Sequence, residues 1–175
     1  MEFETVAEFD FPRERVFAAY RDSVEALKRY LPNVTEVRVL SRADEGEVSK
    51  LVNEWRAGGE LPAVVRPFVP ADATGWTDHA TWDGARFTCA WRTEPHAFRD
   101  AVRSAGDHRF EELAGGRTRV TVKGYVEVDP RQIPGVPKLI AGTLKGPVEQ
   151  FVVASVRENL KAFARAAESY LREQG

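Results

Sequence analysis

The feature that most constrains this chain is a long stretch near its C-terminus in which nothing breaks a helix. The stretch begins at Pro147, a residue suited to the first turn of a helix, and runs to about Arg172. Its apolar residues recur every three or four positions, which is typical of a helix that buries one face. About 26 residues of helix span roughly 39 Å, and an eight-residue strand covers only about 26 Å. This one helix is therefore long enough to cross a whole sheet. The apolar positions are Val148, Phe151, Val152, Val156, Leu160, Phe163, Ala167, Tyr170 and Leu171.

Most of the remaining chain alternates apolar and polar residues, as half-buried strands do. A first strand is predicted at residues 2–9, and helical spacing after Pro12 predicts two short helices that end before Pro32. The segment at 130–146 is rich in proline and glycine, so we expect it to be an irregular connector. Further strands are predicted at 34–41, 48–56, 76–82, 87–91, 106–113 and 118–128, with turns at 44–46, 83–84 and 114–116.

This order of elements predicts an α+β fold in which a curved antiparallel sheet of six or seven strands wraps around the C-terminal helix. The order resembles the START-like helix-grip superfamily, which includes polyketide cyclases and aromatases, plant pathogenesis-related allergens and lipid-transfer domains. The resemblance rests on this topology and on the segments 9–17 and 76–91, and residues 142–149 look like an uncharacterised bacterial branch. It implies a deep cavity for an apolar ligand between sheet and helix. It does not imply a reaction, because members of the superfamily bind, transport or catalyse on the same scaffold.

Length and charge narrow the class of protein further. The 175 residues suit a single domain, 1–175. A net charge of −2 without a basic cluster argues against a nucleic-acid partner, and no segment reaches the roughly 20 apolar residues of a membrane span. The single cysteine, Cys89, allows no intramolecular disulfide. With no signal-peptide pattern at the N-terminus, we expect a cytoplasmic protein that is not integral to a membrane. The oligomeric state stays open.

Aromatic and polar residues on the predicted inner faces are the candidate ligand contacts. Trp55, Trp76 and Trp91 come from three strands and either line a pocket or form ordinary core. Asn53 shares a face with Trp55, so it either orients a ligand or bonds a neighbouring group. Tyr125 on the last strand either donates a hydrogen bond inside the cavity or lies on the solvated face of the sheet.

The final helix and one loop supply the remaining candidates. Phe151, Ser155 and Asn159 lie on or beside the apolar stripe of the helix, where they either face the cavity or form its polar edge. The loop at 61–70 is apolar and broken by three prolines, so Val65 and Phe68 are candidates for a lid over the cavity mouth. The alternative is a loop that packs against the end of the sheet.

Neither a metal site nor a cofactor is predicted. The three histidines, His79, His96 and His108, are separated by 17 and 12 residues, which matches no metal-ligand spacing. His79 and His96 are also weak candidates for a general acid or base. No phosphate-binding glycine loop, dinucleotide fingerprint or serine nucleophile motif is present.

Three functional hypotheses follow. The first is binding or transport of a small hydrophobic molecule or lipid. The second is a polyketide cyclase, aromatase or dehydratase, with Tyr125, Asn53 or His79 as catalytic candidates. The third is a protein-interaction module that uses the apolar loop. An isolated titratable group deep in a cavity favours catalysis, an apolar cavity favours carriage, and a filled interior with an exposed apolar patch favours partner binding.

Overall fold

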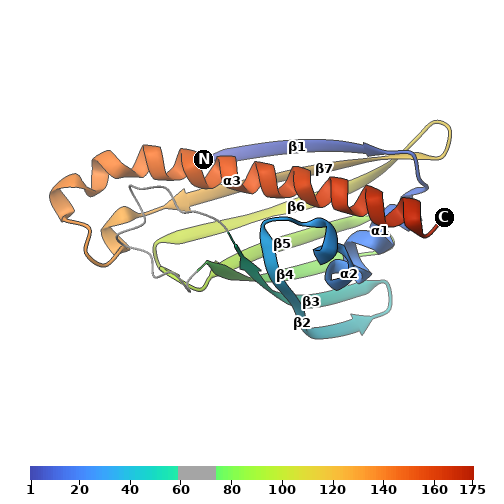
Figure 1. The fold of residues 1–175 in the computed structure, drawn as a ribbon, viewed down its shortest axis with the longest axis horizontal. Coiled ribbons are helices and arrows are strands. Elements are labelled where there is room, and N and C mark those ends of the chain that lie inside the picture. Colours follow the sequence, from blue (N-terminus) through green and yellow to red (C-terminus); the bar gives the residue numbers. More distant parts are fainter. Residues whose placement is uncertain (59–73) are drawn as a thin grey trace.

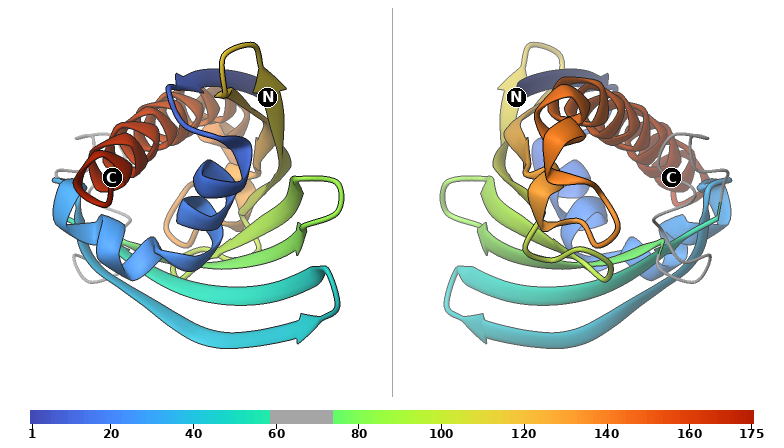
Figure 2. Two further views of the ribbon diagram at one scale, coloured as in Figure 1. Left: turned by 90° about the vertical axis from the view of Figure 1, so that its right-hand side faces the viewer. Right: turned by 90° about the vertical axis from the view of Figure 1, so that its left-hand side faces the viewer.

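A computed structural model of the protein describes residues 1–58 and 74–175. In these residues, seven strands form one antiparallel sheet in the order β1-β7-β6-β5-β4-β3-β2. The helix-grip fold is confirmed, because the sheet curves around and the long helix α3 crosses its open side (Figures 1 and 2). The strands are β1 (Glu2–Phe9), β2 (Val34–Glu45), β3 (Val48–Ala57), β4 (Gly75–Asp83), β5 (Thr88–Pro95), β6 (Val102–Leu113) and β7 (Arg117–Val128).

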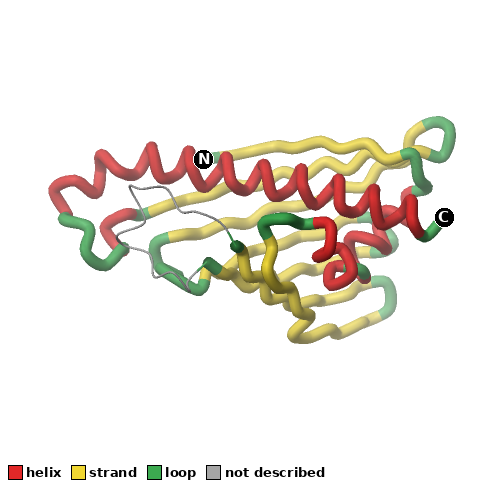
Figure 3. Tube along the Cα trace, in the orientation of Figure 1, coloured by secondary structure: helices red, strands yellow, loops and turns green. Residues whose placement is uncertain are grey.

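The helices follow the predicted order. Two short helices, α1 (Arg13–Asp22) and α2 (Val24–Leu27), come after the first strand, and a 3-10 turn (Lys28–Tyr30) extends α2. They lie at the end of the sheet where α3 finishes (Figure 3). A second 3-10 turn (Pro130–Gln132) precedes α3, which runs over Lys138–Glu173. Among the described residues, no helix is long and apolar enough to cross a membrane.

The start of α3 corrects the sequence prediction. The helix begins at Lys138, nine residues before Pro147, which lies inside it. A proline removes one hydrogen bond from a helix, but packing on both sides can keep the helix continuous. Here Ala141 is fully buried before the proline and Val148 is buried after it. The Glu149 carboxylate also accepts a hydrogen bond of 3.1 Å from the backbone N–H of Val128.

Strand register divides the sheet into an inner face, toward α1 and α3, and an outer face. Because side chains alternate along a strand, residues paired across neighbouring strands form rows on one face. Inner-face positions such as Leu51, Trp82 and Val126 are buried. Outer-face positions such as Arg119 and Lys123 form ion pairs with Glu8 and Glu4 of β1.

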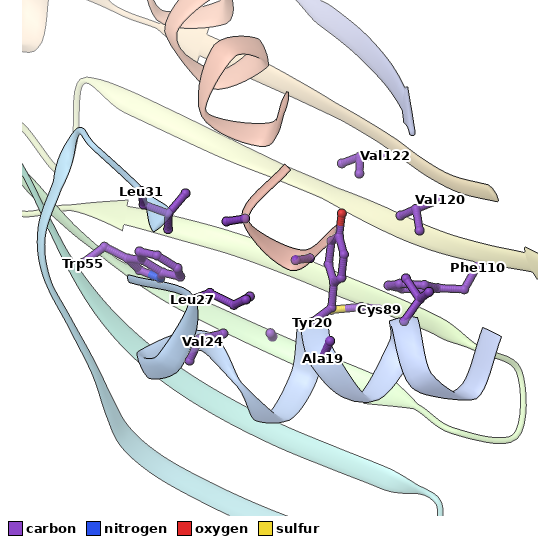
Figure 4. Close-up of a cluster of buried hydrophobic side chains, with 14 of the residues drawn as sticks. Ala19, Tyr20, Val24, Leu27, Leu31, Trp55, Cys89, Phe110, Val120 and Val122 are labelled. Atoms are coloured by element: carbon purple, nitrogen blue, oxygen red, sulfur yellow. The ribbon is translucent and has the colours of Figure 1, made fainter. Parts of the chain in front are cut away.

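One end of the inner face is closed by a cluster of aromatic rings, here called the packed end. Phe17 of α1 makes edge-to-face contacts with Trp82, Phe87 and Phe110 at centroid distances of 5.2–5.4 Å. Tyr20 stands between α1 and strand β7, as Figure 4 shows, and contacts Phe110 at 5.3 Å. Aromatic pairs in this geometry add to the free energy gained by burial. The packed end therefore holds the short helices against the sheet.

Two glycines let aromatic rings lie flat on the middle of the inner face. Gly106 and Gly124 are cross-strand partners on β6 and β7. A Cβ at Gly106 would lie 2.7 Å from the Trp91 ring, and a Cβ at Gly124 would lie 2.8 Å from the Phe3 ring. Glycine in a strand often marks such a close approach. The two rings, with centroids 6.3 Å apart, thus cover the middle of the sheet.

Candidate functional site

Four polar residues form one row across the inner face, here called the polar row. Strand pairing places Asn53 of β3 opposite Asp78 of β4, Asp78 opposite Thr93 of β5, and Thr93 opposite Ser104 of β6. Asn53 is 3% exposed and Ser104 is 9% exposed, so the row lies inside the molecule. An unbroken row of polar side chains on a mostly apolar face is unusual, because buried polar groups must find partners.

Asp78 is the titratable group of this row. The Asn53 side-chain nitrogen donates a hydrogen bond of 3.3 Å to Asp78 Oδ2. Burial raises the pKa of Asp78 to about 6, although the bond from Asn53 acts in the opposite direction. The Asn53 carbonyl oxygen is buried and has no partner among the described residues. The row therefore presents one buried hydrogen-bond acceptor that no described residue satisfies.

Tryptophans flank the polar row on both sides. Trp55 and Trp76, the next inner-face residues along β3 and β4, stack with centroids 5.9 Å apart and ring planes 5° apart. On the other side, Trp91 lies over Gly106. The Trp91 indole nitrogen is buried and has no hydrogen-bond partner among the described residues. A small polar group set between aromatic walls is typical of ligand pockets.

Partial exposure on this part of the inner face indicates unfilled space. Trp76, Asp78, Trp91 and Thr93 are half-buried, although they face the side that α3 covers. At the packed end, by contrast, Trp82 is only 5% exposed. A side chain that faces the interior and keeps exposed surface borders space that the surrounding side chains do not fill. These four residues of the inner face therefore keep surface that the rest of the protein does not cover.

His108 lies between the polar row and the packed end. Its ring is surrounded by Tyr20, Trp82 and Trp91 at centroid distances of 6.0–6.2 Å. Burial lowers the pKa of His108 to about 4, so the imidazole is neutral near pH 7. Its Nδ1 has no hydrogen-bond partner in the part of the chain that the structure describes. Burial also raises the pKa of Cys89, the cross-strand partner of His108, so this thiol stays protonated.

A separate groove of about 200 Å³ lies between β1, β7 and α3. Its apolar floor includes Phe9 and Tyr20, and its rim carries Glu8, Lys161 and Glu168. Pockets for drug-sized ligands are larger, at about 300–1,000 Å³. This groove alone is therefore too small for such a ligand, and the polar row is the stronger candidate site.

The structure brings four of the predicted site residues together. Asn53, Trp55, Trp76 and Trp91 all lie on the inner face of β3, β4 and β5, as their alternation predicts. Ser155 is half-buried on α3. The proposed lid residues Val65 and Phe68 lie outside the described residues.

Three predicted cavity residues lie elsewhere. Tyr125 is 44% exposed on the outer face, because its neighbours Gly124 and Val126 point inward. Phe151 is 38% exposed and Asn159 is also exposed, so neither is enclosed between helix and sheet. Val153 is buried instead, because the face of a long helix that meets a curved sheet shifts along its length.

The histidines proposed as acid or base lie on the outer face. His79 Nε2 is 3.4 Å from the Glu94 carboxylate, and His96 Nε2 is 3.1 Å from the Thr77 hydroxyl. Within residues 1–58 and 74–175, no three His, Cys, Asp or Glu side chains are grouped as metal ligands would be.

Sequence reasoning missed Asp78, the residue that gives the site its charge. The sequence does indicate this position, because Asp78 lies two residues from Trp76 and Ala80 and four from Trp82, a spacing that places all four on one face of a strand. Thr93 continues the alternation of Cys89 and Trp91, whereas Ser104 precedes the strand predicted at 106–113. Their place in the row depends on the register of β4, β5 and β6.

Comparisons with known proteins agree with this fold. A family model described as "Protein of unknown function (DUF2505)" matches residues 4–171. No curated protein matches the chain.

Similar solved structures include three from bacteria. The Zhui aromatase/cyclase from Streptomyces sp. R1128 has a TM-score of 0.70 at 19% identity, over 99% of this chain and 94% of that one. TTHA0849 from Thermus thermophilus has a TM-score of 0.65 at 22% identity, over 97% of this chain and 99% of that one. A START superfamily protein from Mycobacterium smegmatis has a TM-score of 0.54 at 16% identity, over 99% of both chains. At these low identities the structural likeness shows a shared START-like fold and no more, so function must be argued from the site.

Proposed function

Since the chain belongs to the DUF2505 family, whose model covers nearly all of it, we propose from its site that it binds a small, largely apolar molecule between the inner face of the sheet and α3. The observation that carries the proposal is the half-buried polar row between tryptophans, with the buried Asn53 oxygen left unpartnered among the described residues. Unpaired buried polar groups reduce stability, so their presence beside unfilled space favours a ligand that pairs with them. A lipid or an aromatic compound with one polar end fits this arrangement.

Similar structures support the proposal as analogy. The Zhui aromatase/cyclase and the START superfamily protein share the fold over almost the whole chain. The resemblance to the helix-grip superfamily implies a cavity between sheet and helix, and this chain carries its polar row on the inner face that would border it.

Native mass spectrometry of the protein purified from its own host tests the proposal first. A bound molecule released by organic extraction would support binding and identify the chemical class. A neutral fluorescent probe such as Nile red provides the second readout, since it brightens in apolar surroundings.

A variant that fills the proposed space makes the test specific. Thr93→Trp adds an indole on the inner face of β5 beside Asp78. If space exists there, the protein tolerates the indole and loses Nile red binding by about tenfold or more. In a filled core, overpacking of this size costs about 1–3 kcal/mol instead. Thr81→Trp on the exposed outer face of β4 is the matched control, and it should leave probe binding unchanged. Unchanged binding in Thr93→Trp would contradict the proposal.

A second candidate function is catalysis of the cyclase, aromatase or dehydratase type. The observation that favours it is Asp78, a carboxyl with a pKa of about 6 that faces the interior, since such a group can give or take a proton near neutral pH. Asp78→Asn would then abolish turnover of a polyketide-like substrate while leaving its binding within about twofold. If Asp78→Asn leaves turnover intact, Asp78 is not the acid or base.

A further inference from the structure

We propose that Asn53 and Asp78 form a recognition site for a protonated amine, so that the molecule bound by this chain is an apolar amine rather than a neutral lipid or alcohol. This inference rests on the proposed function, because it names the chemical class of ligand at the same site. It follows from the hydrogen-bonding groups, the charge and the aromatic surroundings of the pair.

The hydrogen-bonding groups of the pair call for a donor. The Asn53 side chain donates one amide hydrogen to Asp78 Oδ2, and its own carbonyl oxygen is buried and has no partner among the described residues. No described residue donates a hydrogen bond to the other Asp78 oxygen. An ammonium group carries up to three hydrogens, whereas an alcohol carries one. One ammonium can therefore bond both the Asn53 oxygen and the Asp78 carboxylate.

The negative charge of Asp78 also favours a cationic ligand. At pH 7 Asp78 is above its pKa of about 6, so it is mostly ionised although burial disfavours the charge. No described Lys or Arg forms an ion pair with it. The basic side chains nearby in the sheet lie on the outer face, where Arg56 pairs with Glu36 and Arg92 with Glu94. A bound cation would supply a counter-charge that the described residues do not.

The aromatic surroundings suit a cation with an apolar body. The stacked indoles of Trp55 and Trp76 follow Asn53 and Asp78 along the same two strands. Tryptophan faces attract cations at distances up to about 6 Å. In the other direction the inner face is apolar, with Leu51, Ala80 and Trp91 in the next row. The ammonium would lie at the polar row and the apolar part would extend over these residues.

Three other described side chains that face the interior have pKa values that burial moves out of the range between about pH 5 and 7. Burial raises the pKa of Cys89 on β5 and of Tyr20 on α1, and it lowers the pKa of His108 on β6 to about 4. From α3, Glu149 faces the sheet, bonded to the Val128 N–H and near Lys145. Of these four side chains with shifted pKa values, Asp78 is therefore the one that changes charge between about pH 5 and 7.

The test compares two probes of the same shape, 2-naphthylmethylamine and 2-naphthylmethanol, as competitors of Nile red. At pH 7.5 the amine should bind about tenfold or more tightly than the alcohol. The amine stays protonated throughout, so its advantage should fall as pH drops through about 6 and Asp78 gains a proton. This pH profile needs no variant.

Variants then assign the effect to Asp78. Asp78→Asn should remove the preference for the amine, so that amine and alcohol bind with affinities within about twofold of each other. Asp107→Asn removes a carboxylate from the outer face of β6 and should leave both affinities unchanged.

Two outcomes would overturn the inference, and they are distinguishable. Equal binding of amine and alcohol at pH 7.5, or an amine preference that survives in Asp78→Asn, would refute amine recognition and leave the proposed function standing. If Nile red and both naphthyl probes fail to bind, the proposed function fails and this inference fails with it.

Discussion

The packed end and the polar row lie on the same inner face, yet they differ in how completely their side chains are packed and paired. At the packed end, aromatic rings fill the interior and leave Phe17, Trp82 and Phe110 only 2–5% exposed. Two rows along the strands from Trp82, Asp78 keeps partial exposure and Asn53 keeps an oxygen that no described residue pairs with. The first region maximises stability and the second reduces it. Where local chemistry opposes stability, a functional site is the expected reason.

The largest expected effect is at the packed end. Phe110→Ala removes a ring that contacts Phe17 at 5.2 Å and Tyr20 at 5.3 Å. The free energy of unfolding, measured with urea, should fall by about 3–5 kcal/mol. Tyr125→Ala on the exposed outer face is the control and should cost less than about 1 kcal/mol. A loss below about 1 kcal/mol for Phe110→Ala would mean that this end is not tightly packed.

His108 should make the protein less stable in acid. Its folded pKa of about 4 lies below the value of about 6.5 for an unfolded chain, so the unfolded state binds more protons in between. The stability from this group is present above about pH 6.5, and about 3 kcal/mol is lost as pH falls toward 4. His108→Phe should remove this loss when urea unfolding is followed between pH 4 and 7. An unchanged pH profile would show that His108 is not buried in neutral form.

Asp78 should make the free energy of unfolding change with pH in the opposite direction from His108. Its folded pKa of about 6 is raised above the unfolded value near 3.9, so the folded state binds more protons between those values. The contribution of Asp78 to the free energy of unfolding is therefore most favourable below about pH 4, and it falls as pH rises to 6. Asp78→Asn should raise the free energy of unfolding at pH 7 by about 2–3 kcal/mol.

The two single variants check each other. Between about pH 4 and 6 the effects of His108 and Asp78 oppose, so each single variant should reveal the slope of the other. If Asp78→Asn destabilises the protein at pH 7, the carboxylate has a compensating partner and the site is not strained.

The smallest effect is expected on α3. Asn159 is exposed and Ser155 is half-buried beside the helix face that meets the sheet. Asn159→Ala should change stability by less than about 0.5 kcal/mol and leave Nile red binding unchanged. Ser155→Ala is the paired variant, and a change in probe affinity there alone would extend the site to the helix. A large loss of binding in Asn159→Ala would place that residue in the site.

Periodicity alone determined much of this protein. Alternation grouped the residues of β1, β3, β4 and β5 by face, and three- to four-residue spacing identified α3, because burial of one face imposes these periods on the sequence. The same alternation contained the position of Asp78. Both periods are properties of a short segment, so they can be read from the sequence of that segment alone.

Tertiary structure decided the rest. Which residues of four strands meet in one row depends on register, and the alternation of a single strand does not specify its partner. Only the folded sheet aligned Asn53, Asp78, Thr93 and Ser104, and turned Tyr125 outward. Likewise, α3 extends back past Pro147 because Ala141 packs against the body of the protein. Burial and register come from contacts between segments far apart in the chain, which no local pattern specifies.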